Sequence, residues 1–217
     1  AAAYLCDKTL EPPFVSLLAS GGHTAVILVD PDYSFRVLGG TMDDAVGESF
    51  DKVARVLGLE YPGGPNIERL AREGKNVVPM PRMLKGNDGY SFSYSGLKTA
   101  VINYVHKKEQ AGEGYSKADV AASFQSAALD ILAEKALEAC EESGYRILTV
   151  GGGVAANGYL RDLLTKKCAD KSIKLVLPPK ILCTDNAAMI GAEGYLQYKK
   201  RNFSDLSLNA RARVDLG

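Results

Sequence analysis

The stretch between Arg146 and Leu177 constrains the fold of this chain more than any other. A compact apolar run, Arg146–Val150, continues directly into Gly151–Gly153; leucines at helical spacing follow, and a second apolar run covers Lys174–Leu177. A strand, a glycine turn, a helix and a second strand in this order predict two parallel strands joined by a helical crossover. The chain is therefore expected to be an α/β protein.

The glycines of Gly151–Gly153 lie where the first of these strands meets the helix, which is a favourable place for a ligand. Glycines leave the backbone open, and a helix N-terminus presents unsatisfied N–H groups and a positive dipole end. The spacing departs from the G-x-G-x-x-G pattern of dinucleotide sites, so a nucleoside fits better, with Asn157 bonding the ribose or the base. The alternative is that Asn157 only caps the helix.

A second glycine turn lies near the start of the chain. Two β-rich runs, Phe14–Ala19 and Ala25–Val29, flank Ser20-Gly21-Gly22-His23-Thr24 and predict a hairpin, and a third strand is expected over Ser34–Leu38. Paired glycines beside hydroxyl groups can form a concavity that binds phosphate. An ordinary hairpin turn is the alternative.

Helical periodicity accounts for most of the remaining chain. Helices are predicted from Thr41 to Leu57, where Thr41-x-x-Asp44 resembles a capping box, from Asn66 to Arg72, from Gly96 to Lys108, from a Ser116 cap to Gly144, and from a Thr184 cap through Asp185 to about Tyr198. The alternation in Tyr90–Ser95 predicts a short edge strand.

Acidic side chains are concentrated on the first of these helices. Asp44, Glu48 and Asp51 are spaced by four and three residues and are expected along one face, with Asp43 beside them. Such a face could meet a cation, a ribose or a hydroxyl group. A solvated acidic face near a helix N-terminus, favoured by the dipole, is the alternative.

Composition restricts the classes of partner and site. The formal net charge is +0, but from Arg161 onward eleven Lys or Arg stand against six Asp or Glu, so this part could face a nucleic acid. Four cysteines without C-x-x-C spacing predict reduced thiols in a cytoplasmic protein. No run approaches the roughly 18 apolar residues of a membrane span, and no H-E-x-x-H or Ser/His/Asp pattern indicates a hydrolytic site.

Seven stretches, taken together and in order, carry a resemblance to a known family. They are Ser20-Gly21-Gly22-His23-Thr24, Asp43-Asp44-Ala45, Gly47-Glu48-Ser49-Phe50-Asp51-Lys52, Tyr61-Pro62-Gly63-Gly64-Pro65, Phe92-Ser93-Tyr94-Ser95-Gly96-Leu97-Lys98-Thr99, Gly151-Gly152-Gly153-Val154-Ala155-Ala156-Asn157 and Cys183-Thr184-Asp185-Asn186-Ala187-Ala188-Met189-Ile190. The chain resembles the TsaD family of tRNA adenosine threonylcarbamoyltransferases, formerly described as glycoproteases or O-sialoglycoprotein endopeptidases. The resemblance spans essentially the whole chain.

The resemblance implies an actin-like ATPase fold of the sugar-kinase and heat-shock type, with two α/β lobes and a nucleotide between them. The chain would be the C-terminal lobe, in which 1–12 is the tail of a helix from the other lobe. Residues 13–198 would bind the nucleotide or threonylcarbamoyl-adenylate and include a helical insertion at about 59–143, and 199–217 would be a C-terminal tail. Such a fragment is expected to be inactive alone.

The resemblance also implies a reaction and its site residues. Family members transfer a threonylcarbamoyl group from its AMP anhydride to the exocyclic amine of the adenosine adjacent to the tRNA anticodon. The matching positions for the adenylate are Leu18, Ala19, Ser20, Gly21, Gly22, Asp51, Gly64 and Asn157, with Glu68 where some relatives carry an Asp ligand. The family holds one divalent metal, usually iron, through a His-x-x-x-His pair and an aspartate; Asp185 matches the aspartate, and the histidine pair has no counterpart. No general base is assigned.

The expected partners are tRNA, an adenine nucleotide as threonylcarbamoyl-AMP or ATP, and, in a bacterium, a TsaB-type scaffold homologue and a TsaE-type ATPase. The expected location is the cytoplasm, without a membrane partner, and the fold's partner surface allows a dimer. Alternatives are a metalloprotease, a non-catalytic scaffold homologue and a small-molecule kinase of the same fold. The missing zincin motif argues against the first, whereas Asp185 and Asn157 favour the catalytic paralogue over the scaffold.

Overall fold

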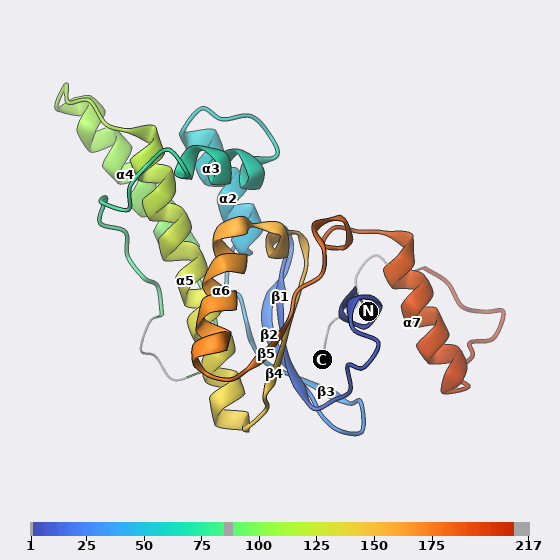
Figure 1. Cartoon of the computed structure of the whole chain (residues 1–217). Helices are drawn as coiled ribbons and strands as arrows, with labels where there is room; N and C mark the ends of the chain where they lie inside the picture. The colour runs from blue at the N-terminus through green and yellow to red at the C-terminus, as the bar shows by residue number, and fades with distance from the viewer. Residues whose placement is uncertain (1, 85–88, 211–217) are drawn as a thin grey trace.

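One five-stranded mixed sheet forms the centre of the molecule in a computed structural model that describes residues 2–84 and 89–210 (Figure 1). The strands are β1 (Phe14–Ala19), β2 (Thr24–Val29), β3 (Phe35–Gly40), β4 (Ile147–Gly151) and β5 (Lys174–Val176), in the order β3-β2-β1-β4-β5. Strand β2 is antiparallel to both β1 and β3, and β4 is parallel to both β1 and β5. The predicted hairpin, the parallel strand pair and the α/β class are therefore confirmed.

Helices cover both faces of the sheet. They are α1 (Ala2–Cys6), α2 (Val46–Val56), α3 (Gly63–Ala71), α4 (Ser95–Gln110), α5 (Lys117–Ser143), α6 (Gly158–Asp170) and α7 (Ala187–Lys199), with 3-10 turns η1 (Gly153–Ala156) and η2 (Lys180–Leu182). Figure 1 shows α5 and α6 on one side of the sheet and α1 with α7 on the other. No helix in the described part of the chain is long and apolar enough to cross a membrane.

The long helix α5 forms the centre of the hydrophobic core. The Ser116 hydroxyl oxygen accepts a hydrogen bond from Asp119 N at 3.1 Å, and Gly144 ends the helix in the left-handed conformation with φ 74°, as the sequence predicted. Its Phe124 is fully buried and meets Phe50 of α2 edge to face, with ring centroids 4.9 Å apart. Because α5 contacts both the sheet and α3, it connects the strands to the helices that flank the site.

Four helices begin at residues other than those predicted, although α4 differs by one residue only, with Ser95 in place of Gly96. Helix α2 begins at Val46 rather than Thr41, since the Thr41 hydroxyl donates to Asp44 O at 2.7 Å in a turn before the helix. Helix α3 begins at Gly63, ahead of the predicted Asn66. Helix α7 begins after Asn186, not Thr184, because Asn186 Oδ1 accepts from Met189 N; none of its residues is buried.

The expected edge strand over Tyr90–Ser95 is wrong. Only an isolated bridge between Thr41 and Phe92 forms there, and residues 85–88 of the preceding loop lie outside the described residues. The segment instead lies along the end of β3, where Phe92 N donates to Gly40 O at 3.0 Å. This approach requires glycine at 39, because an added Cβ would come within 2.4 Å of the Tyr90 backbone.

Candidate functional site

The two glycine turns lie together at one edge of the sheet. Strands β1 and β4 are parallel neighbours, with Leu18 opposite Gly151, so both turns follow the carboxyl ends of adjacent strands. Gly152 has φ 92° and packs so closely on β1 that an added Cβ would lie 2.3 Å from Ala19 O. In open α/β sheets this edge is the usual place for a ligand.

The hairpin turn is exposed and stabilised by its own serine. Ser20 N donates to His23 O at 2.8 Å, and Ser20 Oγ accepts from His23 N at 3.0 Å and from Gly22 N at 3.3 Å. Cβ atoms added at Gly21 and Gly22 would meet nothing within 4 Å, so the outer side of the turn is open. A phosphate oxygen bound here would compete with Ser20 Oγ for two backbone N–H groups.

The start of α2 packs directly against the hairpin turn. Gly47 N donates to Ser20 O at 3.1 Å, and a Cβ at Gly47 would lie 2.8 Å from both Ser20 O and Gly21 Cα. Val46 N donates to the buried Thr24 hydroxyl at 2.9 Å. Gly47 is thus a site residue that sequence analysis did not assign, although it stands within a quoted motif.

Asn157 is buried, and both ends of its carboxamide have protein partners. Its Oδ1 accepts from Leu160 N at 3.1 Å, which caps α6, and its Nδ2 donates to Gln125 Oε1 at 2.9 Å. One Nδ2 hydrogen remains for a ligand. Gln125 is 5% exposed and was missed, since a single polar residue within a long helical pattern shows no partner in the sequence.

Glu68 occupies the N-terminal end of α6. Its Oε1 accepts from Gly158 N at 3.2 Å and also pairs with Arg72. A carboxylate already complements the positive end of this helix, so a second anion such as phosphate would be repelled. The turn at Gly151–Asn157 therefore suits a neutral nucleoside better than a phosphate.

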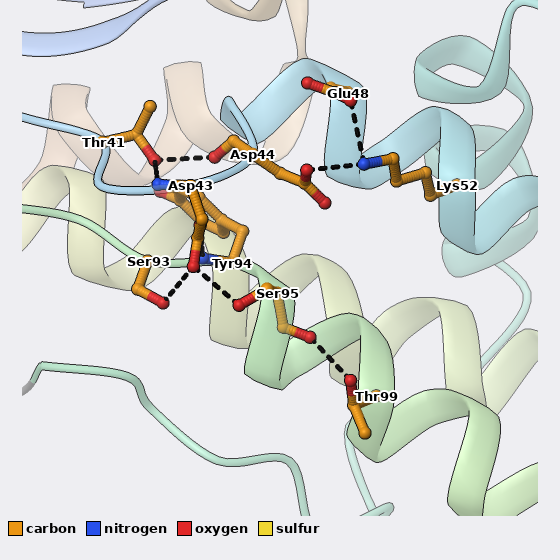
Figure 2. Close-up of polar contacts among 9 residues, drawn as sticks. All are labelled: Thr41, Asp43, Asp44, Glu48, Lys52, Ser93, Tyr94, Ser95 and Thr99. Carbon is orange, nitrogen blue, oxygen red and sulfur yellow. Dashed lines mark hydrogen bonds and ion pairs between the residues drawn. The ribbon is translucent and has the colours of Figure 1, made fainter.

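The acidic residues near α2 have protein partners rather than being only solvated. Lys52 pairs with Asp44 and, at 2.8 Å, with Glu48, and these two hydrogen bonds raise the pKa of Lys52 (Figure 2). Asp51 accepts from Gly63 N at 2.8 Å through Oδ1. The three carboxylates therefore stabilise two different contacts.

The Asp51 contact positions the first turn of α3, which contains Gly64. A Cβ at Gly63 would lie 2.6 Å from Asp51 Cα, so α2 and the start of α3 are in close backbone contact. A Cβ at Gly64 would meet nothing within 4 Å, and this glycine is only partly buried. Asp51 thus acts on the predicted ligand position Gly64 through the start of α3.

Asp185 lies apart from these residues, exposed, just before α7. Across residues 2–84 and 89–210, no three His, Cys, Asp or Glu side chains come together as a metal site would require. One exposed carboxylate does not fit a metal centre by itself. Arg161 connects the Gly151–Asn157 turn to the segment that follows β5, a contact that the sequence did not indicate. Its guanidinium donates to Ala155 O at 3.0 Å and to Pro178 O at 2.9 Å.

Sequence comparison shows strong similarity to one family. The family described as TsaD, tRNA N6-adenosine threonylcarbamoyltransferase, matches residues 1–192. Curated tRNA N6-adenosine threonylcarbamoyltransferases from Clostridium botulinum (strain Kyoto / Type A2) and Staphylococcus aureus (strain Newman) are 48% and 47% identical over 211 and 210 residues, respectively. Each alignment covers 97% of this chain, and the chain spans 62% of the length of these relatives.

Solved structures of low sequence identity share the fold. Full-length HypF in its phosphate- and nucleotide-bound form has a TM-score of 0.68 at 14% identity, covering 94% of this chain and 35% of that one. The activator of 2-hydroxyisocaproyl-CoA dehydratase from Clostridium difficile, with bound ADPNP, has a TM-score of 0.54 at 14% identity, covering 94% and 68%. These neighbours confirm the predicted actin-like ATPase fold and nothing further.

Proposed function

The chain belongs to the TsaD family, tRNA N6-adenosine threonylcarbamoyltransferase, and we propose that it forms the adenylate-binding part of such an enzyme. The reaction transfers a threonylcarbamoyl group from threonylcarbamoyl-AMP to the exocyclic amine of the adenosine adjacent to the tRNA anticodon. One observation carries the proposal: the open hairpin turn and the Gly151–Asn157 turn lie at adjacent parallel strand ends, with Leu18 opposite Gly151.

The two turns divide the adenylate between them. The exposed hairpin, with unobstructed space at Gly21 and Gly22, receives the phosphate. The Gly151–Asn157 turn receives the adenosine, because Glu68 makes it unfavourable for an anion. Asp51 holds the first turn of α3, which contains Gly64.

The proposed reaction develops its largest negative charge at the hairpin turn, where the phosphate would bind. The adenosine amine attacks the carbamoyl carbon, the bond from that carbon to the phosphate oxygen breaks, AMP leaves with its negative charge, and the amine releases one proton to solvent. Backbone N–H groups at the hairpin stabilise the charge that develops on the phosphate. The hairpin would therefore bind the transition state more tightly than the adenylate itself.

Asp185 is the one metal ligand that we propose for this chain. A single carboxylate does not complete a site, so no step is derived through a metal. Asp185→Ala should lower the affinity for divalent iron in a protein of the relatives' full length, as measured by calorimetry. Unchanged affinity would contradict this assignment.

The proposed partners follow from the reaction. They are tRNA, the adenylate or ATP, a TsaB-type scaffold homologue and a TsaE-type ATPase, with a dimer through the fold's partner surface, all in the cytoplasm. The excess of Lys and Arg over Asp and Glu from Arg161 onward supports contact with a nucleic acid.

A bulky substitution in the hairpin tests the proposal. In a protein of the relatives' full length, Gly22→Val should weaken threonylcarbamoyl-AMP binding about tenfold, because the side chain fills the open phosphate side while the fold has room for it. Gly114→Val, also in open space but in the α4–α5 connection, is the matched control and should bind normally. Binding and transfer to tRNA are measured by calorimetry and by mass analysis of the modified adenosine.

Two results would overturn the proposal at different points. If the unmodified protein forms no threonylcarbamoyladenosine when the adenylate, tRNA and partner proteins are supplied, the proposed reaction is wrong. If Gly22→Val transfers and binds as well as the unmodified protein, the reaction stands and the phosphate position is wrong.

A further inference from the structure

Asp43 makes the most complete set of hydrogen bonds of any carboxylate in the segment that precedes α2. Its Oδ2 accepts from the hydroxyl groups of Ser93 and Ser95, both at 2.6 Å, and its Oδ1 accepts from Tyr94 N at 2.8 Å (Figure 2). Partial burial opposes ionisation, but these hydrogen bonds outweigh it and lower the pKa of Asp43. The carboxylate is therefore charged at neutral pH.

The same carboxylate caps α4 from another part of the chain. Helix α4 begins at Ser95, and its N-cap residue, Tyr94, makes no side-chain cap hydrogen bond. A carboxylate that accepts from a backbone N–H at a helix N-terminus supplies the missing cap and complements the dipole. Asp43 therefore fixes the segment before α2 against the first turn of α4.

The opposite side of this segment is bonded to the hairpin. Thr41 N donates to Thr24 O and Val46 N to Thr24 Oγ1, both at 2.9 Å, and Gly47 N donates to Ser20 O at 3.1 Å. Three backbone N–H groups within residues 41–47 thus end on the hairpin. Residues 41–47 form a bridge, which we call the 41–47 bridge, between the hairpin turn and α4.

The bridge has little room to adjust between these two ends. The Thr41 hydroxyl donates to Asp44 O at 2.7 Å, and the Asp44 carboxylate is held by Lys52 (Figure 2). A Cβ at Gly47 would clash with Ser20 O, so no space separates α2 from the hairpin. If the 41–47 bridge shifts at Asp43, the hairpin turn must therefore shift with it, because the packing between them leaves no free space.

We propose that Asp43 is a positioning residue, which fixes the 41–47 bridge from its outer side and thereby holds the hairpin turn in the geometry that receives the adenylate phosphate. The phosphate part rests on the proposed function, whereas the mechanical coupling between Asp43 and the hairpin does not. Asp43 touches no part of the adenylate in this proposal, so its loss acts only through the position of the hairpin turn.

Amide hydrogen exchange on the chain tests the coupling directly. Asp43→Ala should speed exchange about tenfold at Tyr94 N and also at Val46 N and Gly47 N. Asp32→Ala is the matched control, because Asp32 also accepts from a serine N–H and hydroxyl, those of Ser34, in the β2–β3 turn. The control should leave the exchange of all three amides unchanged.

Steady-state kinetics in a protein of the relatives' full length provide the second readout. Asp43→Ala should lower kcat/KM for threonylcarbamoyl-AMP about tenfold, with KM raised and kcat reduced, because the hairpin turn binds both the adenylate and the transition state. Asp43→Asn, which keeps an acceptor for Tyr94 N, should recover part of the loss. A purely structural role would lower the apparent kcat in proportion to the folded fraction and leave KM unchanged.

The outcomes separate the possibilities. Faster exchange confined to Tyr94 N, or an unchanged KM in a folded Asp43→Ala protein, would overturn the positioning role. If Asp43→Ala does not fold, Ser95→Ala removes one hydrogen bond and should give the same changes at smaller size; no change there overturns the proposal. Asp43→Ala could speed exchange at Tyr94 N, Val46 N and Gly47 N while the unmodified protein transfers no threonylcarbamoyl group. That result would contradict the proposed function but support the coupling between Asp43 and the hairpin.

Discussion

The hairpin turn after β1 and the glycine turn after β4 lie at neighbouring strand ends, yet they are held in different ways. The hairpin is exposed, bonded to itself through Ser20 Oγ, and supported from outside by the 41–47 bridge. The glycine turn is packed closely against β1 at Gly152 and fixed through Asn157 by Gln125. Two similar runs of glycine thus give one open turn suited to an anion and one rigid turn suited to a nucleoside.

The largest expected difference between the turns concerns backbone space. Gly152→Ala should destabilise the protein by about 3 kcal/mol, because the new Cβ would clash with Ala19 O in a left-handed conformation. Gly21→Ala meets open space and should change the free energy of unfolding by less than about 1 kcal/mol. Urea unfolding of both variants measures the difference, and equal losses would contradict it.

The next expected effect concerns the buried cap of the glycine turn. Asn157→Ala removes the cap of α6 and leaves the buried Gln125 oxygen without its donor, which should cost about 2–3 kcal/mol. Asn186→Ala removes the equivalent cap from the exposed helix α7 and should cost about 1 kcal/mol. Thermal unfolding should rank the two variants in this order, and the reverse order would show that Gln125 contributes little.

A smaller effect is expected at the hairpin's own serine. Ser20→Ala removes the acceptor of the Gly22 and His23 N–H groups in an exposed turn, so stability should fall by only about 0.5–1 kcal/mol. Exchange of these two amides should become faster, while exchange of Asn157 N, bonded to Val154 O, stays as before. Faster exchange in both turns would mean that they are not independently supported.

The smallest expected effect is a dependence on pH on the hairpin side. The native pKa of Asp43 is lowered from 3.8, so its stabilising contribution is present above pH 3.8 and is lost as the pH falls through the native value. The difference in unfolding free energy between the unmodified protein and Asp43→Asn should therefore shrink below pH 3.8. A difference that stays constant to lower pH would show that the charge of Asp43 is not involved.

Much of the fold was predictable because its signals are local. The spacing of leucines and the Ser116 and Gly144 caps defined α5, and the run from Arg146 into three glycines defined the parallel unit. The start of α2 was predicted wrongly for a physical reason. Its first turn is satisfied by the Thr24 hydroxyl, a partner twenty-two residues away in the sequence.

The backbone of the candidate site was predictable, and its side-chain contacts were less so. The Ser20–Gly22 turn and the Asn157 cap were predicted because turn and cap residues have local signatures. Gln125 and Arg161 were missed, since their roles depend on partners in other elements. Asp51 was singled out, but its contact with Gly63 could not be seen from a spacing that placed it beside Glu48.

By itself, the sequence determined the α/β class, the hairpin, the strand–glycine–helix–strand unit and the family, because periodicity, turn residues and ordered motifs are local properties of the chain. Only the tertiary structure decided which glycine turn is open and which is packed, and that the Glu68 carboxylate occupies the N-terminal end of α6 beside one of them. It alone connected Asp43 to the hairpin. Hydrogen bonds and packing between distant segments form when the sheet brings the two turns together, and no local pattern encodes them.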